Sequence, residues 1–207
     1  VHADHLPASF DCLKQAAREV GSVQIQNRAT IAGNICNASP AADGVPALLV
    51  LDAEIELASV HTTRRMPLSD FLKGNRQTAR QPDEIVTGIF IPDTAARGSS
   101  AFFKLGARRY LVISIAMVAA RIELADTGLV QAAAVSVGAC SVVARRLPDL
   151  ETDLVGRGLA DTHSVPQARH LVGLSPIDDV RAPAGYRLDA ALEGVRRAVA
   201  ACVETVQ

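Results

Sequence analysis

The chain has 207 residues, which is long for one domain and short for two, and its 49% apolar content is sufficient for a substantial core. A formal net charge of −1, scattered arginine pairs and the absence of Trp argue against a nucleic-acid partner. The four cysteines form no C-x-x-C pair, which excludes an iron–sulfur cluster or zinc ribbon held by this chain alone and predicts reduced thiols in a cytoplasmic protein.

The first predicted element is a short amphipathic helix. Ser9 is a plausible N-cap, apolar residues recur at helical spacing from Leu13 to Val20, and Gly21 stops the pattern. No basic region followed by an apolar core precedes it, so no secretion signal is expected.

Residues 27–44 read NRATIAGNICNASPAADG, and no amphipathic element needs that order. We interpret them as a strand, ending in the β-branched residues Thr30 and Ile31, that breaks into a tight polar loop. Small residues let another group approach the backbone, and asparagine offers donors and an acceptor. The loop suits a phosphate-bearing ligand, but an ordinary strand-to-helix connection, with Asp43 capping the next helix, fits equally well. No G-x-G-x-x-G or Walker sequence occurs.

The remainder of the first half contains two predicted strands and two short helices. Pro46 begins a buried helical segment, and residues 53–59 alternate as a strand with one wet face. A proline-initiated helix over residues 66–72 and a turn over residues 75–83 follow. Residues 84–91 form the clearest strand, with three isoleucines expected on one face: Ile85, Ile89 and Ile91.

Composition changes near Pro92, and residues 93–100 are predicted to be a linker. Two apolar stretches, residues 110–125 and 129–143, are joined by a hairpin-type turn and are expected to be antiparallel strands. The longest apolar run falls short of the ~20 residues that a membrane span requires. Short helices are predicted to begin at Pro148 and Pro166, and a C-terminal helix over residues 188–202 should lie on the hairpin.

Few other residues indicate chemistry on their own. Lys104 lies in an otherwise apolar strand, where its ammonium can face a cofactor or solvent, and solvent is the more common outcome. The histidines show no metal-ligand spacing, and no G-x-S-x-G sequence occurs. Cys36 is the one thiol within the polar loop, and simple packing is the favoured interpretation.

Three features occur together: N-R-A-T-I-A-G-N-x-x-x-x-S-P-x-x-D, a strand ending at Ile91-Pro92, and F-K-L-G-x-R-R followed by I-S-I-A. In this combination the chain resembles the FAD-binding subunit, or middle domain, of the molybdenum hydroxylases. That family includes xanthine dehydrogenase, aldehyde oxidase and the medium subunit of carbon monoxide dehydrogenase. The resemblance covers nearly the whole chain from about Val20.

The resemblance implies a set of cofactor-binding residues. Five residues match the family's T-I-G-G-N loop, which holds the FAD pyrophosphate: Thr30, Ile31, Ala32, Gly33 and Asn34. Asn37 is grouped with them. Asp43 matches a carboxylate that hydrogen-bonds sugar or ribityl hydroxyls, and Val86 matches an apolar position near the isoalloxazine ring. Lys104 matches a lysine that approaches the flavin and helps stabilise its reduced, anionic form, and Val20 aligns with a residue that packs on the cofactor.

The resemblance also implies a function. Such enzymes oxidise substrate at molybdenum and relay electrons through two [2Fe-2S] clusters to FAD, which passes them to NAD, oxygen or another acceptor. This chain would be the FAD-binding electron-transfer component, with no catalytic residue and no metal of its own. Its partners would be an iron–sulfur subunit and a molybdopterin subunit. The alternative is a non-catalytic assembly or scaffold module that no longer binds FAD.

The chain departs from the family pattern in two ways. Ala32 replaces the first glycine of the loop, and its methyl group could crowd a close phosphate contact. Family members also begin with a further subdomain that carries a second glycine-rich loop, and nothing before Ser9 supplies it. We expect that subdomain to lie on a missing part of the chain or on a separate polypeptide.

The expected fold class is α+β. Residues 1–97 are predicted to form the second FAD subdomain, a small sheet with helices. Residues 98–207 are predicted to form the C-terminal domain, an antiparallel sheet that carries helices.

Overall fold

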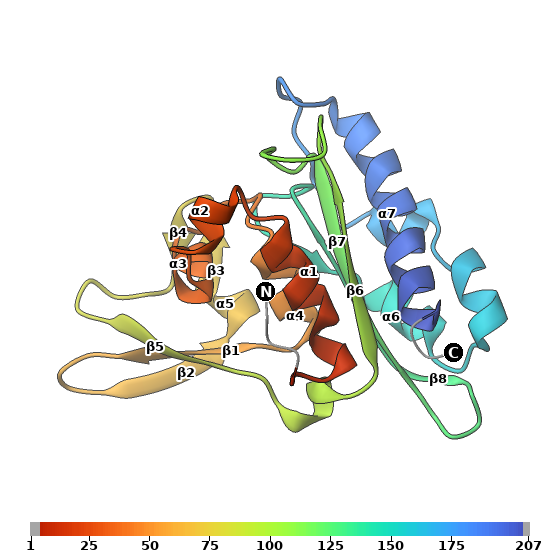
Figure 1. The fold of residues 1–207 in the computed structure, drawn as a ribbon, viewed down its shortest axis with the longest axis horizontal. Helices are drawn as coiled ribbons and strands as arrows, with labels where there is room; N and C mark the ends of the chain where they lie inside the picture. Colours follow the sequence, from red (N-terminus) through yellow and green to blue (C-terminus); the bar gives the residue numbers. More distant parts are fainter. Residues whose placement is uncertain (1–4, 205–207) are drawn as a thin grey trace.

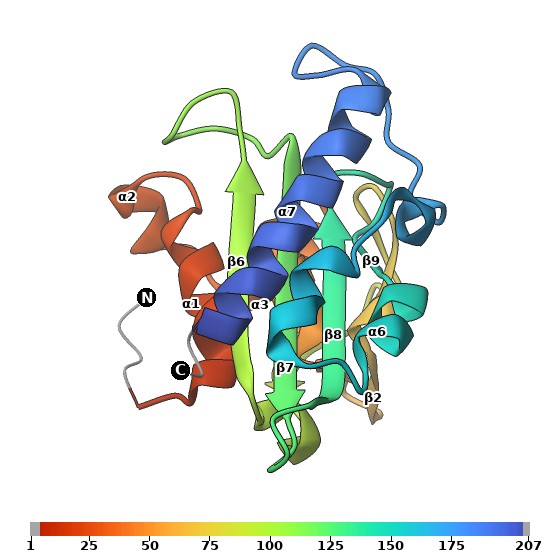
Figure 2. The same ribbon diagram turned by 90° about the vertical axis from the view of Figure 1, so that its right-hand side faces the viewer.

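The structure is a computed structural model that describes residues 5–204. Its main elements are β6 (Ser99–Leu105), β7 (Ala116–Leu124), β8 (Val130–Gly138), β9 (Arg145–Arg146), α1 (Asp11–Arg18), α4 (Gly44–Val50) and α7 (Ala184–Glu204). The four strands form an antiparallel sheet in the order β6-β7-β8-β9, which stands in the middle of the molecule in Figure 1. Helix α7 crosses one face of this sheet, and α1 and α4 lie against the other (Figures 1 and 2). The α+β class with antiparallel sheets is therefore confirmed.

A second antiparallel sheet extends sideways as an arm, at the left in Figure 1. It has the order β2-β1-β5, and its strands are β1 (Glu54–Ala58), β2 (Thr63–Pro67) and β5 (Ile85–Phe90). The smaller elements are α2 (Val23–Gln26), α3 (Ile31–Cys36), α5 (Leu68–Phe71), β3 (Leu72–Gly74), β4 (Gln77–Thr78) and α6 (Pro148–Leu154). Short 3-10 helices cover Ala8–Phe10, Asp93–Ala96, Leu159–Ser164 and Ala168–Leu171.

Strand alternation decides which side chains of the central sheet face which helix layer. On β7, Val118 and Ile122 pack in the core under α7, whereas Ala119 packs in the opposite layer, against α1 and α4. That opposite layer consists largely of small side chains: Cys12, Ala16, Ala47, Val50, Leu51, Ala119 and Ala134. Small residues let α1 and α4 approach the strands closely, so the first half of the chain is packed directly on the sheet of the second half.

Strand β5 corrects one expectation about which residues share a face. Ile85 is 66% exposed, while Val86, Ile89 and Ile91 pack against the core that also contains Ile55 and Leu57. The pairing of β5 with β1 skips Thr87, which is a β-bulge. One extra residue reverses the alternation, so Val86 and Ile89 point the same way and Ile85 points outward.

Most of the other expected elements are confirmed, including α4, β1, the β7–β8 hairpin, α6 and α7. Several boundaries were wrong. The strand expected over residues 110–125 begins only at Ala116, and residues 66–67 of the expected helix belong to β2. Ser9 does not cap α1, because a 3-10 turn precedes the helix and Phe10 occupies the N-cap. Ser99 and Ser100 are buried in β6 and not in a linker. The helix expected from Pro166 is only the 3-10 turn Ala168–Leu171.

Candidate functional site

Asp43 immediately precedes α4, but its side chain makes no capping hydrogen bond to that helix. Asp43 Oδ2 instead accepts a hydrogen bond from Lys104 Nζ at 2.6 Å, and Oδ1 accepts one from Ser114 Oγ at 2.6 Å. Only 6% of the Lys104 side chain and 9% of the Asp43 side chain are exposed. The structure therefore brings two sequence-predicted residues together as a buried ion pair, and the expectation that Lys104 faces solvent was wrong.

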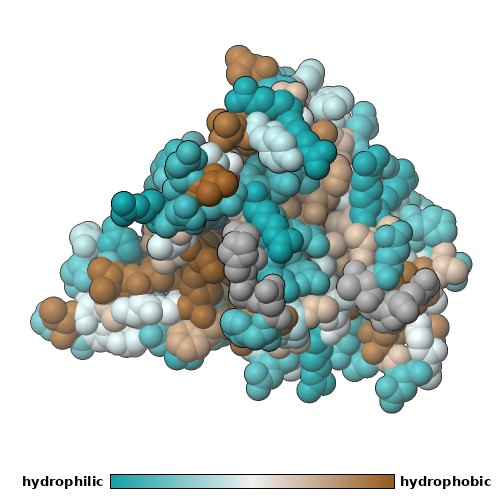
Figure 3. All heavy atoms as spheres, in the orientation of Figure 1, coloured by the Kyte–Doolittle hydropathy of each residue, from teal (hydrophilic) through white to brown (hydrophobic). Residues whose placement is uncertain are grey.

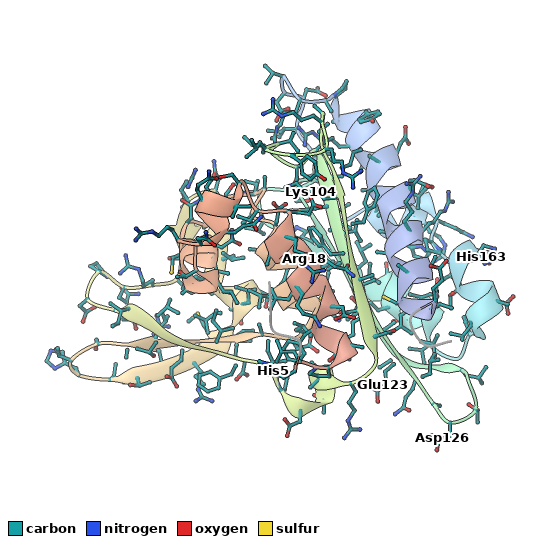
Figure 4. All side chains as sticks on the ribbon, in the orientation of Figure 1. His5, Arg18, Lys104, Glu123, Asp126 and His163 are labelled. Atoms are coloured by element: carbon teal, nitrogen blue, oxygen red, sulfur yellow. The ribbon has the colours of Figure 1, made fainter. Side chains whose placement is uncertain are left out.

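Lys104 reaches this position because of its place on β6. Ser100 and Phe102 face α1, where Ser100 Oγ accepts a hydrogen bond from the Cys12 backbone, so alternation turns Lys104 to the same side. Figure 4 labels Lys104 near the end of β6, on the side of α1. Its ammonium also donates to the Glu19 carbonyl at 3.0 Å. An ammonium has three N–H donors, so one remains for a further partner.

The electrostatics of Asp43 reflect two opposing effects. Burial raises the pKa of the Asp43 carboxyl above its ordinary value of 3.8. The hydrogen bonds from Lys104 and Ser114 lower the pKa and offset only part of this rise. The adjacent ammonium favours the charged carboxylate, which accepts hydrogen bonds through several lone pairs. Two of these are used, so Asp43 can still accept a bond from a ligand hydroxyl.

Residues Thr30 to Asn34 form the start of α3, and not a strand that breaks into a loop. Thr30 is the N-cap: its Oγ1 accepts a hydrogen bond from the Gly33 N–H at 2.9 Å, and its carbonyl accepts one from the Asn34 N–H. This cap outweighs the β-preference of the two β-branched residues. Within residues 5–204, no acceptor is found for the N–H groups of Ile31 and Ala32, as is usual in a first helical turn.

Asn34 connects this helix to Asp43. Asn34 Oδ1 is buried and has no hydrogen-bond partner among the described residues. It lies against Gly44, where an added Cβ atom would come within 2.9 Å of it. Gly44 follows Asp43, so the Asn34 amide, the first turn of α3 and the Asp43–Lys104 pair are neighbours.

Of the three other predicted residues, Asn37 and Val86 lie apart from this cluster. The Asn37 side chain accepts a hydrogen bond from Arg76, at the turn between β3 and β4. Val86 lies in β5 of the arm and packs in the core beneath α4. Val20, by contrast, is partly buried and directly follows Glu19, whose carbonyl accepts a hydrogen bond from Lys104, so its backbone adjoins the ion pair.

Sequence reasoning missed Ser114 and the Glu19 carbonyl as partners of the pair. Ser114 interrupts the longest apolar run of the chain and is 1% exposed. A buried hydroxyl needs a partner, so a serine inside an apolar run was a signal for a polar contact. The Glu19 contact uses a backbone carbonyl and leaves no trace in the sequence.

Three apolar side chains of α2 and of the start of α3 are exposed. Val23 is 66% exposed, Ile25 49% and Ile31 46%. Figure 3 shows brown atoms among the teal ones over α2 and α3. Clustered exposed apolar side chains of this kind mark surfaces that contact a ligand or another polypeptide.

The cluster therefore offers three kinds of interaction. Two unused N–H groups at a helix start suit an anionic oxygen such as that of a phosphate. Asn34 and Asp43 supply acceptors for hydroxyl or amine hydrogens, and Lys104 supplies a positive charge.

Within residues 5–204 no group of three or more His, Cys, Asp or Glu residues is arranged to hold a metal ion. Nor is any helix in the described part of the chain long and apolar enough to cross a membrane.

Two family models match the sequence. The model of the FAD binding domain in molybdopterin dehydrogenase matches residues 1–94, and the model of the CO dehydrogenase flavoprotein C-terminal domain matches residues 101–202. Relatives include the nicotinate dehydrogenase FAD-subunit of Eubacterium barkeri, 39% identical over 150 residues, which cover 71% of this chain and 51% of that subunit. The nicotine 6-hydroxylase medium subunit of Paenarthrobacter nicotinovorans is 30% identical over 200 residues, which cover 95% of this chain and 67% of that subunit.

A solved structure also matches the chain. Reconstituted CO dehydrogenase from Oligotropha carboxidovorans contains a chain that superposes with a TM-score of 0.85 at 25% identity, covering 98% of this chain and 70% of that chain. The chain thus spans about half of the nicotinate dehydrogenase subunit, and about two thirds of the nicotine 6-hydroxylase subunit and of the matched CO dehydrogenase chain.

Proposed function

Because the chain belongs to the family of FAD-binding subunits of the molybdenum hydroxylases, we propose that it binds FAD where α3, the start of α4 and Lys104 meet. One observation carries the proposal: Asn34 Oδ1 is buried without a partner among residues 5–204 and lies against Gly44, the residue after Asp43. Asn34 belongs to the same short helix as the Ile31 and Ala32 N–H groups, for which no acceptor is found in that range. These groups fit a ligand that carries both phosphates and hydroxyls. When bound, FAD supplies the ability to accept two electrons and to pass them on.

We assign the following roles to the residues of this chain. The first turn of α3 holds the pyrophosphate through the Ile31 and Ala32 N–H groups, with Thr30 fixing the turn and Gly33 keeping it open. Ala32 keeps its N–H, so its methyl group does not remove a donor. Asn34 and Asp43 accept hydrogen bonds from sugar or ribityl hydroxyls.

The remaining residues supply positive charge or lie at the edge of the proposed site. The Lys104 ammonium favours negative charge near the isoalloxazine ring through its remaining N–H. Asn37 and Val86 remain proposed contacts farther from the Asp43–Lys104 pair.

We propose further that the protein works within a larger enzyme. It would receive electrons from [2Fe-2S] clusters and deliver them through FAD to NAD or another acceptor. The clusters and the molybdopterin would lie on partner subunits. An N-terminal FAD subdomain with a second glycine-rich loop would complete the FAD-binding site. The four free thiols support a reducing, cytoplasmic compartment.

Flavin titration tests the proposal. FAD is added to the purified protein and its fluorescence is followed, with riboflavin, which lacks phosphate, as the comparison ligand. We expect saturable quenching by FAD and weaker binding of riboflavin. Asn34→Asp places a second carboxylate beside Asp43 and the phosphates, so it should raise the FAD Kd by about tenfold or more, equivalent to roughly 1.4 kcal/mol.

Asn75→Asp is the matched control, because it makes the same change at an exposed turn between β3 and β4 and should leave the FAD Kd unchanged. Saturable binding that Asn34→Asp does not weaken would refute the assigned position. A protein that binds no flavin under any condition would instead support the non-catalytic module.

A further inference from the structure

Ser114 is attached at two points, and only one of them belongs to the cluster around Asp43. Its hydroxyl donates to Asp43 Oδ1 at 2.6 Å. Its backbone carbonyl accepts a hydrogen bond from Arg181 Nη1 at 2.8 Å. Ser114 is 1% exposed and its contact with Asp43 is buried, whereas its contact with Arg181 is partly buried. Arg181 is therefore one residue removed from the Asp43 carboxylate, although it lies in the segment that leads into α7.

Arg181 is itself held in place by Asp179. The guanidinium donates to Asp179 Oδ2 through Nη2 at 2.5 Å and Nε at 3.1 Å, and the Arg181 backbone N–H donates to Oδ1 at 2.8 Å. A two-point contact between a planar guanidinium and a carboxylate fixes orientation as well as distance. These hydrogen bonds, chiefly from Arg181, hold the pKa of the Asp179 carboxyl far below its usual range.

Asp179 is in turn anchored to α7 by Arg187. Arg187 Nη2 donates to Asp179 Oδ1 at 2.6 Å, and Nη1 donates to the carbonyl of Ile115 at 2.7 Å and to that of Ala139 at 3.2 Å. Arg187 is fully buried. Arg187 thus contacts both the residue before β7 and the residue after β8.

The chain just before Ser114 lacks regular structure of its own. Leu111 has a positive φ of 50°, and Tyr110, Leu111 and Ile113 are exposed. The Ile115 N–H donates to the Leu105 carbonyl, so regular strand pairing begins only after Ser114. The peptide that follows Ser114 is therefore held at two points, by Arg181 at the Ser114 carbonyl and by Leu105 at the Ile115 N–H. Arg181 is the side chain of this pair of contacts.

We propose that Arg181, oriented by Asp179 and anchored through Arg187, is a positioning residue for the Asp43 carboxylate. It holds the Ser114 backbone so that the Ser114 hydroxyl faces Asp43 Oδ1, which leaves Oδ2 to Lys104. The functional consequence rests on the proposed function, in which Asp43 accepts a hydroxyl of FAD. The segment before α7 then sets the geometry of a cofactor site built mainly by the first half of the chain.

The test measures Asp43 itself as well as FAD binding. The carboxyl carbon of Asp43 is followed by NMR as the pH is varied, with its signal assigned by comparison with Asp43→Asn. The variants are Ser114→Ala, Arg181→Ala and Arg181→Lys. Arg169→Ala is the matched control, because Arg169 also pairs with an aspartate, Asp153, in the second half but does not contact Ser114.

We expect Ser114→Ala and Arg181→Ala to raise the pKa of the Asp43 carboxyl above that of the wild type, because a hydrogen bond to the charged form is lost or misaligned. The FAD Kd should rise by about tenfold in Ser114→Ala and by about threefold or more in Arg181→Ala, within the range expected for a hydrogen bond to a charged group. Arg181→Lys retains a donor for the Ser114 carbonyl, so it should restore both readouts in part. Arg169→Ala should change neither.

The outcomes separate this proposal from the proposed function. If FAD binds to the wild type but Arg181→Ala leaves both the pKa of Asp43 and the FAD Kd unchanged, Arg181 has no positioning role and the FAD site stands. If Arg181→Ala shifts the pKa of Asp43 but no variant or wild-type protein binds FAD, the positioning of the carboxylate holds and the FAD proposal fails. A loss of thermal stability without a shift in the pKa of Asp43 would make Arg181 merely structural and overturn the inference.

Discussion

At the Asp43–Lys104 pair, two opposite charges are held almost out of water with a 2.6 Å contact between them. Removing water from two ions is costly, and their mutual attraction offsets this only while both are present. Single substitutions therefore affect both folding and ligand binding, which is why Ser114 and Asn34 are better probes of the site.

A double-substitution cycle tests this coupling. Asp43→Ala leaves the Lys104 ammonium buried without its counter-ion, so it should lower the free energy of unfolding by about 3–5 kcal/mol. Asp43→Ala combined with Lys104→Met removes both charges and should be more stable than Asp43→Ala alone. The measurement is urea unfolding of the wild type, Asp43→Ala, Lys104→Met and the double variant. Losses that simply add in the double variant would show that the two charges do not depend on each other.

At the scale of elements, two turn glycines share a backbone conformation but differ in their surroundings. Gly98, just before β6, has a φ of +79°, and a Cβ atom there would lie 2.2 Å from the Ile122 carbonyl oxygen. Gly128, in the β7–β8 turn, has a φ of +76° and no atom within 4 Å of such a Cβ atom. The turn before β6 therefore needs glycine both for its positive φ and because a side chain would not fit there. The β7–β8 turn needs glycine only for its positive φ.

Alanine substitutions separate the two reasons. Gly128→Ala should lower the free energy of unfolding by about 1–2 kcal/mol, the cost of a left-handed conformation for an L-residue. Gly98→Ala should cost about 1–3 kcal/mol beyond that, because the start of β6 must move away from β7. Thermal unfolding of both variants measures the difference. Equal losses would mean that the turn before β6 adapts without strain.

The elements also show what could be predicted from the sequence. Helix α6 was predicted from Pro148 to Leu154, because proline at a first helical turn is a strong local signal. Strand β5 was predicted correctly, but the side chains that it buries were not, because the bulge at Thr87 depends on the pairing with β1. The sequence predicts a strand at the start of α3, because Thr30 and Ile31 favour strands locally. The hydrogen bond by which Thr30 caps α3 forms only once the first helical turn has formed, so it could not be predicted from these residues alone. The Asp43–Lys104 contact spans 61 positions and was not predicted, because the resemblance implied that each residue approaches the flavin but not that the two pair with each other.

At the scale of the whole molecule, three of the four thiols are buried in its layers. Cys12 lies between α1 and the central sheet, Cys202 between α7 and that sheet, and Cys140 follows β8. Burial raises the pKa of Cys12 to about 12 and that of Cys140 to about 11, and it raises that of Cys202 as well. Cys36 is the exposed thiol.

Thiol labelling tests the layered packing. At pH 8, a disulfide reagent such as Ellman's should react quickly with Cys36 alone, because the thiolate is the reactive form and the other three are buried and protonated. All four thiols should react once the protein is unfolded in guanidinium chloride. Cys36→Ser should abolish the fast phase. A second thiol that reacts as quickly as Cys36 would show that α1 or α7 detaches readily from the sheet.

Helix α4 is fastened at both of its ends by the second half of the chain. Ser114 and Lys104 hold Asp43 before its first turn, while Arg121 donates to the Val50 carbonyl and Arg146 to the Leu49 carbonyl at its last turn. A short helix fixed in this way cannot tilt or slide without breaking a contact to a charged group. The carboxylate that meets a ligand is therefore immobilised before the ligand arrives. In binding by a long, flexible dinucleotide, most of the loss of conformational entropy would fall on the ligand, and little on this wall of the site.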